Sequence, residues 1–136
     1  MKIEFIPTGD PTRTVCQIRV KDKYFYGEAQ CHPQDEDYCS IRTGQTISES
    51  RARIKYYQYL KNEERTKLHA LYEVRHRFRL INVLSREYIT ISNFIKEHEE
   101  ILAELICAIE EEKKFLKDYI DLKDELYKRY RKNKGE

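Results

Sequence analysis

The stretch from residue 45 to residue 134 contains neither proline nor glycine, and this absence constrains the fold more than any other feature of the 136-residue chain. Proline and glycine interrupt helices more strongly than other residues, so the span favours long, continuous helices. Apolar residues recur through it at intervals of three and four: Ile54, Tyr57, Leu60, Leu68, Leu71, Val74, Phe78, Ile95, Leu102, Leu105, Ile109, Leu116 and Tyr119. This spacing predicts amphipathic helices that each bury one face.

Two segments of this span mark helix starts. Thr46 and Glu49 fit a capping box, in which each side chain satisfies a free backbone amide. A Tyr-Ile-Thr-Ile run of poor helix formers precedes the second helix. Three polar residues there can cap it: Thr90, Ser92 and Asn93. We therefore predict helices at 46–88 and 92–132, which a short connection makes antiparallel neighbours. A weaker apolar pattern leaves open a break in the first helix near Asn62.

Three shorter segments before the helices are rich in β-branched and aromatic residues and alternate between apolar and polar: Lys2–Ile6, 14–20 and 24–30. Such alternation is typical of strands, and the Lys-Asp-Lys sequence between the last two predicts a hairpin. Three short strands need a helix against one face to be stable. The sequence thus predicts an α+β fold, with a β-hairpin head at 1–45 and a long antiparallel helical hairpin at 46–136, together one domain.

The predicted hairpin brings two cysteines close together. If Val20 lies opposite Phe25, Cys16 lies opposite Ala29 on the inward face. Cys31 is then the diagonal neighbour of Cys16, at about 7–8 Å. That distance is long for a disulfide, and it suits a metal ion held between two sulfur atoms.

The loop that follows supplies two more possible ligands, His32 and Cys39. Thiolates and an imidazole are ligands that zinc prefers, so Cys16, Cys31, His32 and Cys39 form a candidate structural zinc site. The spacing is not that of a standard zinc finger. The alternative is that the cysteines are ordinary half-buried thiols without a metal.

The charge of the chain is zoned, although its formal net charge is only +2. Residues 46–88 contain ten cations and five acids, residues 96–112 one cation and seven acids, and residues 113–134 nine cations and four acids. Each zone alone is also typical of a solvated helix face. The candidate partner-binding residues are Arg75, Arg77 and Arg79 in the first zone and Glu97, Glu99 and Glu100 in the second. The arginines could meet phosphates or an acidic protein, and the glutamates could imitate a nucleic-acid backbone.

Several classes of protein are disfavoured. No glycine-rich phosphate loop or nucleophile constellation occurs, so we do not expect an enzyme. The N-terminus is too short and polar for a signal peptide, and no run of roughly eighteen apolar residues could span a membrane. Four cysteines without an export signal indicate a reducing, cytoplasmic compartment.

The sequence GEAQCHPQDED at 27–37, followed by Thr43-Gly44 and by RARIK at 51–55, resembles small proteins of phages and mobile elements of Gram-positive bacteria. Proteins of this build in such elements include type II-A anti-CRISPR inhibitors of Cas9. The resemblance covers roughly residues 12–58, which are most of the head and the start of the first helix, and it implies a bacterial host cell.

From this resemblance, the zoned charge and the lack of catalytic motifs, we expect a non-enzymatic inhibitor, monomeric or dimeric. It would dock on a Cas9-type nuclease and block loading of guide or target nucleic acid. A nucleic-acid-binding phage accessory protein is an alternative because of the arginine cluster. A structural coiled-coil assembly protein is another, because of the long helices.

Overall fold

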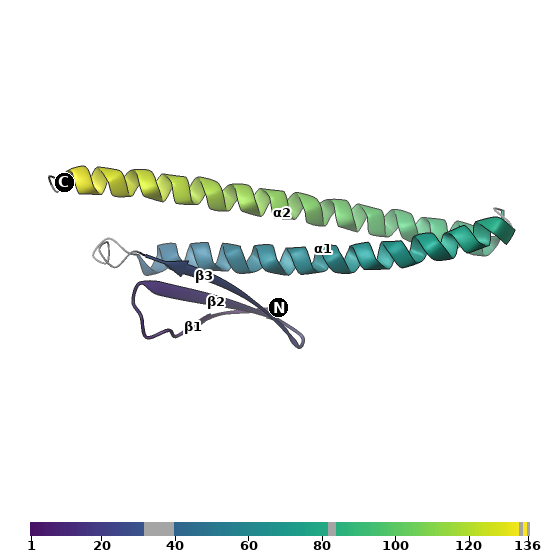
Figure 1. The fold of residues 1–136 in the computed structure, drawn as a ribbon, viewed down its shortest axis with the longest axis horizontal. Helices are drawn as coiled ribbons and strands as arrows, with labels where there is room; N and C mark the ends of the chain where they lie inside the picture. Colours follow the sequence, from purple (N-terminus) through teal and green to yellow (C-terminus); the bar gives the residue numbers. More distant parts are fainter. Residues whose placement is uncertain (32–39, 82–83, 134, 136) are drawn as a thin grey trace. The chain divides into compact units, whose positions relative to one another are not determined.

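The computed structural model describes residues 1–31, 40–81, 84–133 and 135. The described residues form five elements, labelled in Figure 1: β1 (Lys2–Ile6), β2 (Arg13–Val20), β3 (Lys23–Gln30), α1 (Ile41–Ile81) and α2 (Arg86–Asn133). The predicted α+β fold, three antiparallel strands followed by two long helices, is confirmed. The chain forms two compact units: unit 1 comprises Met1–Tyr56 and Glu110–Glu136, and unit 2 comprises Tyr57–Ile109. Each unit therefore contains part of both helices.

The strands form one antiparallel sheet in the order β1-β2-β3. Val20 pairs with Lys23, so only two residues connect β2 to β3, and Lys21 in this turn has a positive φ of 55°. Two-residue hairpin turns favour such angles because their twist then matches that of the strands. The predicted register, with Val20 opposite Phe25, is therefore wrong by two residues, because the turn is shorter than we expected.

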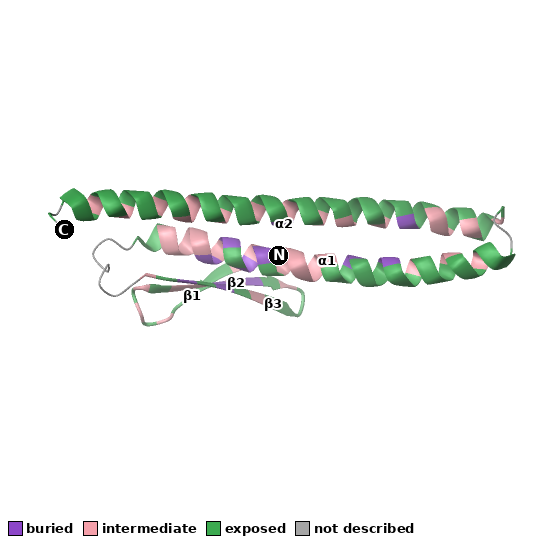
Figure 2. Cartoon of the chain, turned by 45° about the horizontal axis from the view of Figure 1, so that its top comes forward, coloured by how far each residue is buried: buried purple, intermediate pink, exposed green. Residues whose placement is uncertain are grey.

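One face of the sheet packs on α1 within unit 1, where Figure 2 shows buried residues on both the strands and the helix. Cys16, Ile18 and Ala52 form this core. Gly27 marks a close approach of β3 to α1, because a Cβ atom there would overlap the Ser48 carbonyl oxygen and the Ala52 amide nitrogen. The sheet can lie this close to the helix only if position 27 has no side chain.

A second glycine marks a close approach from the helix side. A Cβ atom on Gly44 would overlap the Thr14 hydroxyl of β2. Glycine inside a helix is normally unfavourable by about 1 kcal/mol relative to alanine. Here the missing side chain makes room for the sheet. Gly44 therefore fits inside α1, although we predicted that the helix begins only at residue 46.

The first helix begins at Ile41, five residues before the predicted start at Thr46. The Ser40 hydroxyl caps its first turn, since it accepts a hydrogen bond of 3.4 Å from the Thr43 amide. The Thr46 hydroxyl instead donates to the Arg42 carbonyl oxygen inside the helix, at 2.9 Å. The predicted capping box is therefore wrong, because an earlier serine provides the cap.

The break near Asn62 that the sequence left open does not occur, and the second helix begins earlier than we predicted. Helix α1 is continuous past Asn62, whose carbonyl oxygen accepts a hydrogen bond of 3.0 Å from the Thr66 hydroxyl. Helix α2 begins at Arg86, and the predicted start at residue 92 is wrong. The Ser85 hydroxyl caps it by accepting a hydrogen bond of 3.1 Å from the Tyr88 amide. The β-branched run that follows is helical, because packing of one face outweighs weak helix propensity.

The two helices contact each other in each unit. In unit 1, the Ser50 hydroxyl donates a hydrogen bond of 2.7 Å to the Glu112 carboxylate. In unit 2, Leu68 of α1 and Ile95 of α2 are buried, at 3% and 1% exposure. Within the described residues, neither helix contains a segment apolar and long enough to cross a membrane.

Candidate binding surfaces

The structure separates the two cysteines that the predicted register brings together. Cys16 pairs with Gly27, and Cys31 lies four residues further along the chain. The Cys31 amide donates to the Thr12 carbonyl oxygen at 2.7 Å, which continues the pairing of the two strands. Four residues of strand span about 13 Å, so the expected diagonal contact between Cys16 and Cys31 is wrong.

The chemical states of these cysteines also differ from those of zinc ligands. Cys31 is disulfide-bonded, and neither Cys16 nor Cys107 is its partner. Burial raises the pKa of the Cys16 thiol to about 11, whereas zinc binds the thiolate. His32 and Cys39 lie outside the described residues. Among the residues that the structure describes, no three His, Cys, Asp or Glu side chains are grouped to hold a metal ion, and zinc stays a prediction.

The three candidate arginines of unit 2 do not share one surface. Residues two apart on a helix point about 200° away from each other, so Arg77 lies opposite its two neighbours Arg75 and Arg79. Arg75 is half-buried, and its guanidinium lies over the Tyr72 ring, 5.5 Å from the centroid. Arg77 is exposed beside His76 along a shallow groove of α1. A single arginine-rich docking site is therefore absent from this part of α1.

The three candidate glutamates of α2 are all exposed. Glu99 accepts a hydrogen bond from Tyr72 of α1, and partial burial together with this bond raises the pKa of the Tyr72 phenol. Glu97 and Glu100 form no ion pair with any residue that the structure describes. Glu99 thus joins the two helices, whereas Glu97 and Glu100 face solvent.

An apolar row lies beside these acids on α2, and the predicted apolar stripe did not include it. Residues seven apart share one side of a helix. Glu97 and Glu104 share one side in unit 2, and Phe94 and Ile101 share the adjacent side. Phe94 is 50% exposed and Ile101 is 40% exposed. The predicted stripe is the row that is buried or half-buried, with Ile95 and Ile109 buried, and Phe94 and Ile101 form the exposed row beside it.

The part of α2 that belongs to unit 1 repeats this pattern. Phe115 and Leu122 are again seven residues apart, with exposures of 47% and 53%. Glu111 and Asp118 each stand four residues before one of them and are exposed. Each unit therefore presents acidic side chains next to exposed apolar ones on the same helix.

One polar contact inside unit 2 was not predicted. His98 Nδ1 lies 2.7 Å from Glu64 Oε2, and Glu64 is only 8% exposed. Glutamates surround His98 in the sequence, a pattern that is typical of a surface residue. Its spacing of seven residues from Ile91 and Leu105, both half-buried, is the signal that could have placed it against α1.

Comparisons with known proteins identify no relative: no family model, curated protein or solved structure matches the chain.

Proposed function

We propose that this protein is a non-enzymatic binding protein whose helix α2 occupies a basic protein surface that otherwise binds nucleic acid. The observation that carries the proposal is the acidic block of α2. Residues 97–112 contain seven glutamates and no lysine or arginine. In unit 2, Glu97, Glu100 and Glu104 are exposed on one side of α2 and span about 10 Å, because a helix rises about 1.5 Å per residue. These three acids follow one another about every 5 Å, compared with about 3.4 Å per charge along one nucleic-acid strand.

Repulsion between the acids of the block reduces the stability of the helix. Glu100 lies three residues after Glu97 and four before Glu104, so each adjacent pair projects like charges to neighbouring positions. Such pairs destabilise a helix by about 0.2–0.5 kcal/mol each. No ion pair from these three residues to the rest of the described chain offsets the repulsion. A positively charged partner would remove it.

The apolar row next to the acids suggests how a partner could be held. Electrostatic attraction mainly sets the rate and specificity of association. Affinity depends more on a few large side chains that become buried in the interface. Phe94 and Ile101 are exposed large apolar residues directly beside Glu97. They are the residues of unit 2 that we expect to be buried by the partner.

The resemblance of roughly residues 12–58 to proteins of Gram-positive mobile elements makes a type II-A Cas9-type nuclease the first partner to test. Such a nuclease holds its guide and target strands in a positively charged channel, which is the kind of surface that the acidic block would fit. Binding there would block nucleic-acid loading without any chemistry by this protein.

The order of addition tests this function. The protein, added to guide-free nuclease before the guide RNA, should prevent formation of the nuclease–guide complex in a gel-shift assay. Added after the guide, it should have a much smaller effect, because the channel is then occupied. Equal loss of activity in both orders would show that the protein binds outside the guide-binding surface. No binding to either form would remove the nuclease as a partner.

The predicted alternative, binding to nucleic acid through the arginines of α1, is weakened by their divergence around the helix. It makes a different prediction in the same assay. A protein of that type would retard free guide RNA without nuclease, and replacing Arg77 and Arg79 with glutamine would abolish the retardation.

A further inference from the structure

The face of the sheet that is turned away from α1 carries two exposed tyrosines in unit 1. Gly27 of β3 approaches α1, and Phe25 stacks on the Tyr56 ring of that helix at a centroid distance of 5.2 Å. Because successive strand residues point to opposite faces, Tyr24 and Tyr26 lie on the other side. Their exposures are 47% and 43%. Two residues of strand separate them by about 7 Å, so the rings stand side by side on one surface.

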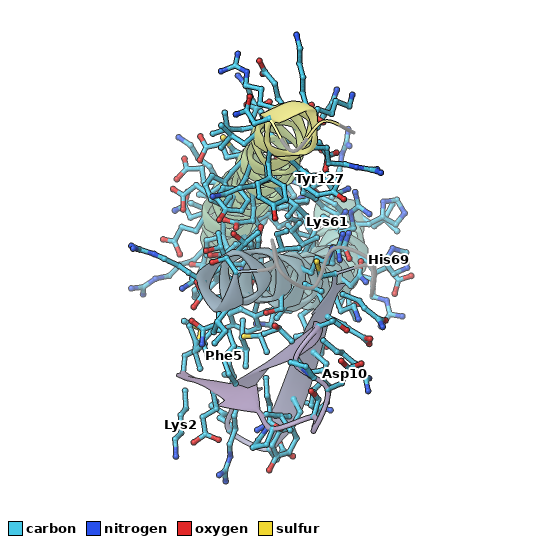
Figure 3. The ribbon with its side chains drawn as sticks, turned by 90° about the vertical axis from the view of Figure 1, so that its left-hand side faces the viewer. Lys2, Phe5, Asp10, Lys61, His69 and Tyr127 are labelled. Atoms are coloured by element: carbon cyan, nitrogen blue, oxygen red, sulfur yellow. The ribbon has the colours of Figure 1, made fainter. Side chains whose placement is uncertain are left out.

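Cations of the neighbouring strands lie on the same face. Arg19 of β2 pairs with Tyr24, and its guanidinium carbon lies 5.8 Å from the centre of the tyrosine ring. Lys2 of β1 pairs with Arg19 on its other side. Figure 3 shows Lys2 extending away from the helices, on the opposite side of the sheet from Phe5. A row of two cations and one tyrosine thus crosses all three strands.

The turn between β2 and β3 adds positive charge at the same end of the sheet. Lys21 and Lys23 flank Asp22 there. Two acids lie on this face of the strands, and each forms an ion pair: Glu4 with Lys2 at 2.7 Å and Glu28 with Arg13 at 2.6 Å. Arg19 and Lys21 then outnumber the one further acid nearby, Asp22, and the surface is positive.

We infer that this outer sheet face, formed by Tyr24, Tyr26, Arg19, Lys2 and Lys21, binds single-stranded nucleic acid. Each tyrosine ring would stack on one base, and the lysines and arginine would contact the phosphates. Stacking on aromatic residues of a sheet is a recurrent way to hold unpaired bases. A duplex hides the faces of its bases, so this surface selects single strands.

The neighbours of the tyrosines favour nucleic acid over a protein partner. Anchor residues of a protein interface usually lie among other groups that exclude water. Here the cross-strand neighbours are Arg19 and Gln17, which are a cation and an amide. Such neighbours suit the phosphates and edges of a splayed-out strand. The inference is independent of the acidic block on α2, which would repel a nucleic acid.

Fluorescence anisotropy of the full chain with a labelled single strand of about twelve nucleotides, in about 50 mM salt, tests this inference. RNA and DNA of the same mixed sequence are both used, and a duplex of that sequence is the comparison. Tyr24→Ala/Tyr26→Ala should raise the Kd at least about tenfold, because stacking on both bases is lost. Tyr24→Phe/Tyr26→Phe should stay within about threefold of the original, because the rings remain.

Two further variants distinguish binding at this surface from nonspecific effects of a substitution on the Kd. Leu80→Ala removes a 75% exposed apolar side chain of α1 from unit 2 and should leave the Kd unchanged. Arg19→Gln should reduce the salt dependence of log Kd by about 0.7, which corresponds to the loss of one phosphate contact. Circular dichroism establishes that each variant is folded. The inference is overturned if the original chain binds no single strand, if it binds the duplex equally well, or if the folded double alanine variant binds normally.

Discussion

His98 Nδ1 of α2 and Glu64 Oε2 of α1 lie 2.7 Å apart between the helices of unit 2. The hydroxyl of Ser50 and the carboxylate of Glu112 form the equivalent contact in unit 1. The two contacts are separated by fourteen residues on each helix, which is two seven-residue repeats. Each contact specifies the antiparallel register of α1 and α2 within its own unit. Apolar residues alone specify such a register weakly, because a shift by seven residues again places apolar residues opposite each other.

The Glu64–His98 contact should stabilise one register of the helices. His98→Ala leaves the mostly buried Glu64 carboxylate without this partner and should reduce the free energy of unfolding by about 1–3 kcal/mol. The double variant Glu64→Leu/His98→Leu should recover most of this loss, because a polar pair replaced by apolar residues can be nearly neutral. Urea denaturation measures both changes. If His98→Ala unfolds at the same urea concentration as the original, the contact contributes no stability.

The close approach of the sheet to α1 predicts different costs for two glycine substitutions. Gly27→Ala would overlap backbone atoms of the helix, which cannot move independently, so we expect a loss of about 1–3 kcal/mol or more. Gly44→Ala would overlap only the Thr14 side chain, which can rotate, and alanine favours a helix by about 1 kcal/mol over glycine. Thermal denaturation of the two variants should therefore show a far lower Tm for Gly27→Ala. Similar Tm values would contradict the packing of β3 against α1.

The burial of Cys16 predicts how its thiol reacts and how it affects stability at high pH. Its folded-state pKa of about 11 lies above the ordinary value of 9.0, so the folded protein keeps this proton while the unfolded chain loses it. The contribution to stability is complete below pH 9 and is lost as the pH rises toward 11. At neutral pH, iodoacetamide should label the exposed Cys107 and not Cys16, as mass spectrometry of tryptic peptides can show. Labelling of Cys16 in the folded protein would contradict its burial.

Elemental analysis of protein purified in reductant tests the zinc prediction together with the register of the sheet. Because Cys16 lies about 13 Å from Cys31, Cys16→Ser should leave the metal content unchanged, whatever that content is. A stoichiometric zinc ion that disappears in this variant would show that the observed register is wrong. The absence of zinc from the original protein would show that the predicted zinc site does not exist.

The like-charge spacing of the acidic block predicts a small gain in stability when one charge is removed. Glu104→Gln removes the repulsion with Glu100 and should raise the free energy of unfolding by about 0.2–0.5 kcal/mol. Glu63→Gln, an exposed acid of α1 with no acid three or four residues away, serves as the control. A loss of stability in Glu104→Gln would indicate that this carboxylate has a structural role in the protein alone.

The element types followed from the sequence because they depend on local patterns. The absence of proline and glycine from residues 45–134 predicted the helices, and alternation predicted the strands. The hairpin register and the helix starts did not follow, because they depend on single contacts. A positive φ at Lys21 shortens the turn, and Ser40 caps α1 before Thr46 can.

The candidate surfaces were only partly visible in the sequence. The acidic block is a property of composition and was found directly. The arginine cluster looked continuous because its members are close in sequence, but the helix turns Arg77 away from Arg75. Phe94 and Ile101 were missed because they lie outside the predicted apolar stripe, and only the packing of α2 on α1 shows how far these two are exposed.

The most direct test of the account is the Kd of the full chain for a guide-free type II-A Cas9-type nuclease, compared between two variants of equal net charge. Glu97→Gln/Glu104→Gln neutralises two acids of the block, and Glu63→Gln/Asp121→Asn neutralises two exposed acids outside it. We expect the first variant to raise the Kd about tenfold or more, because about 1.4 kcal/mol of attraction corresponds to that factor. The second variant should stay within about twofold of the original, since its acids lie outside the interface. Equal effects of the two variants, or no effect of the first, would contradict the role of α2 as the docking surface.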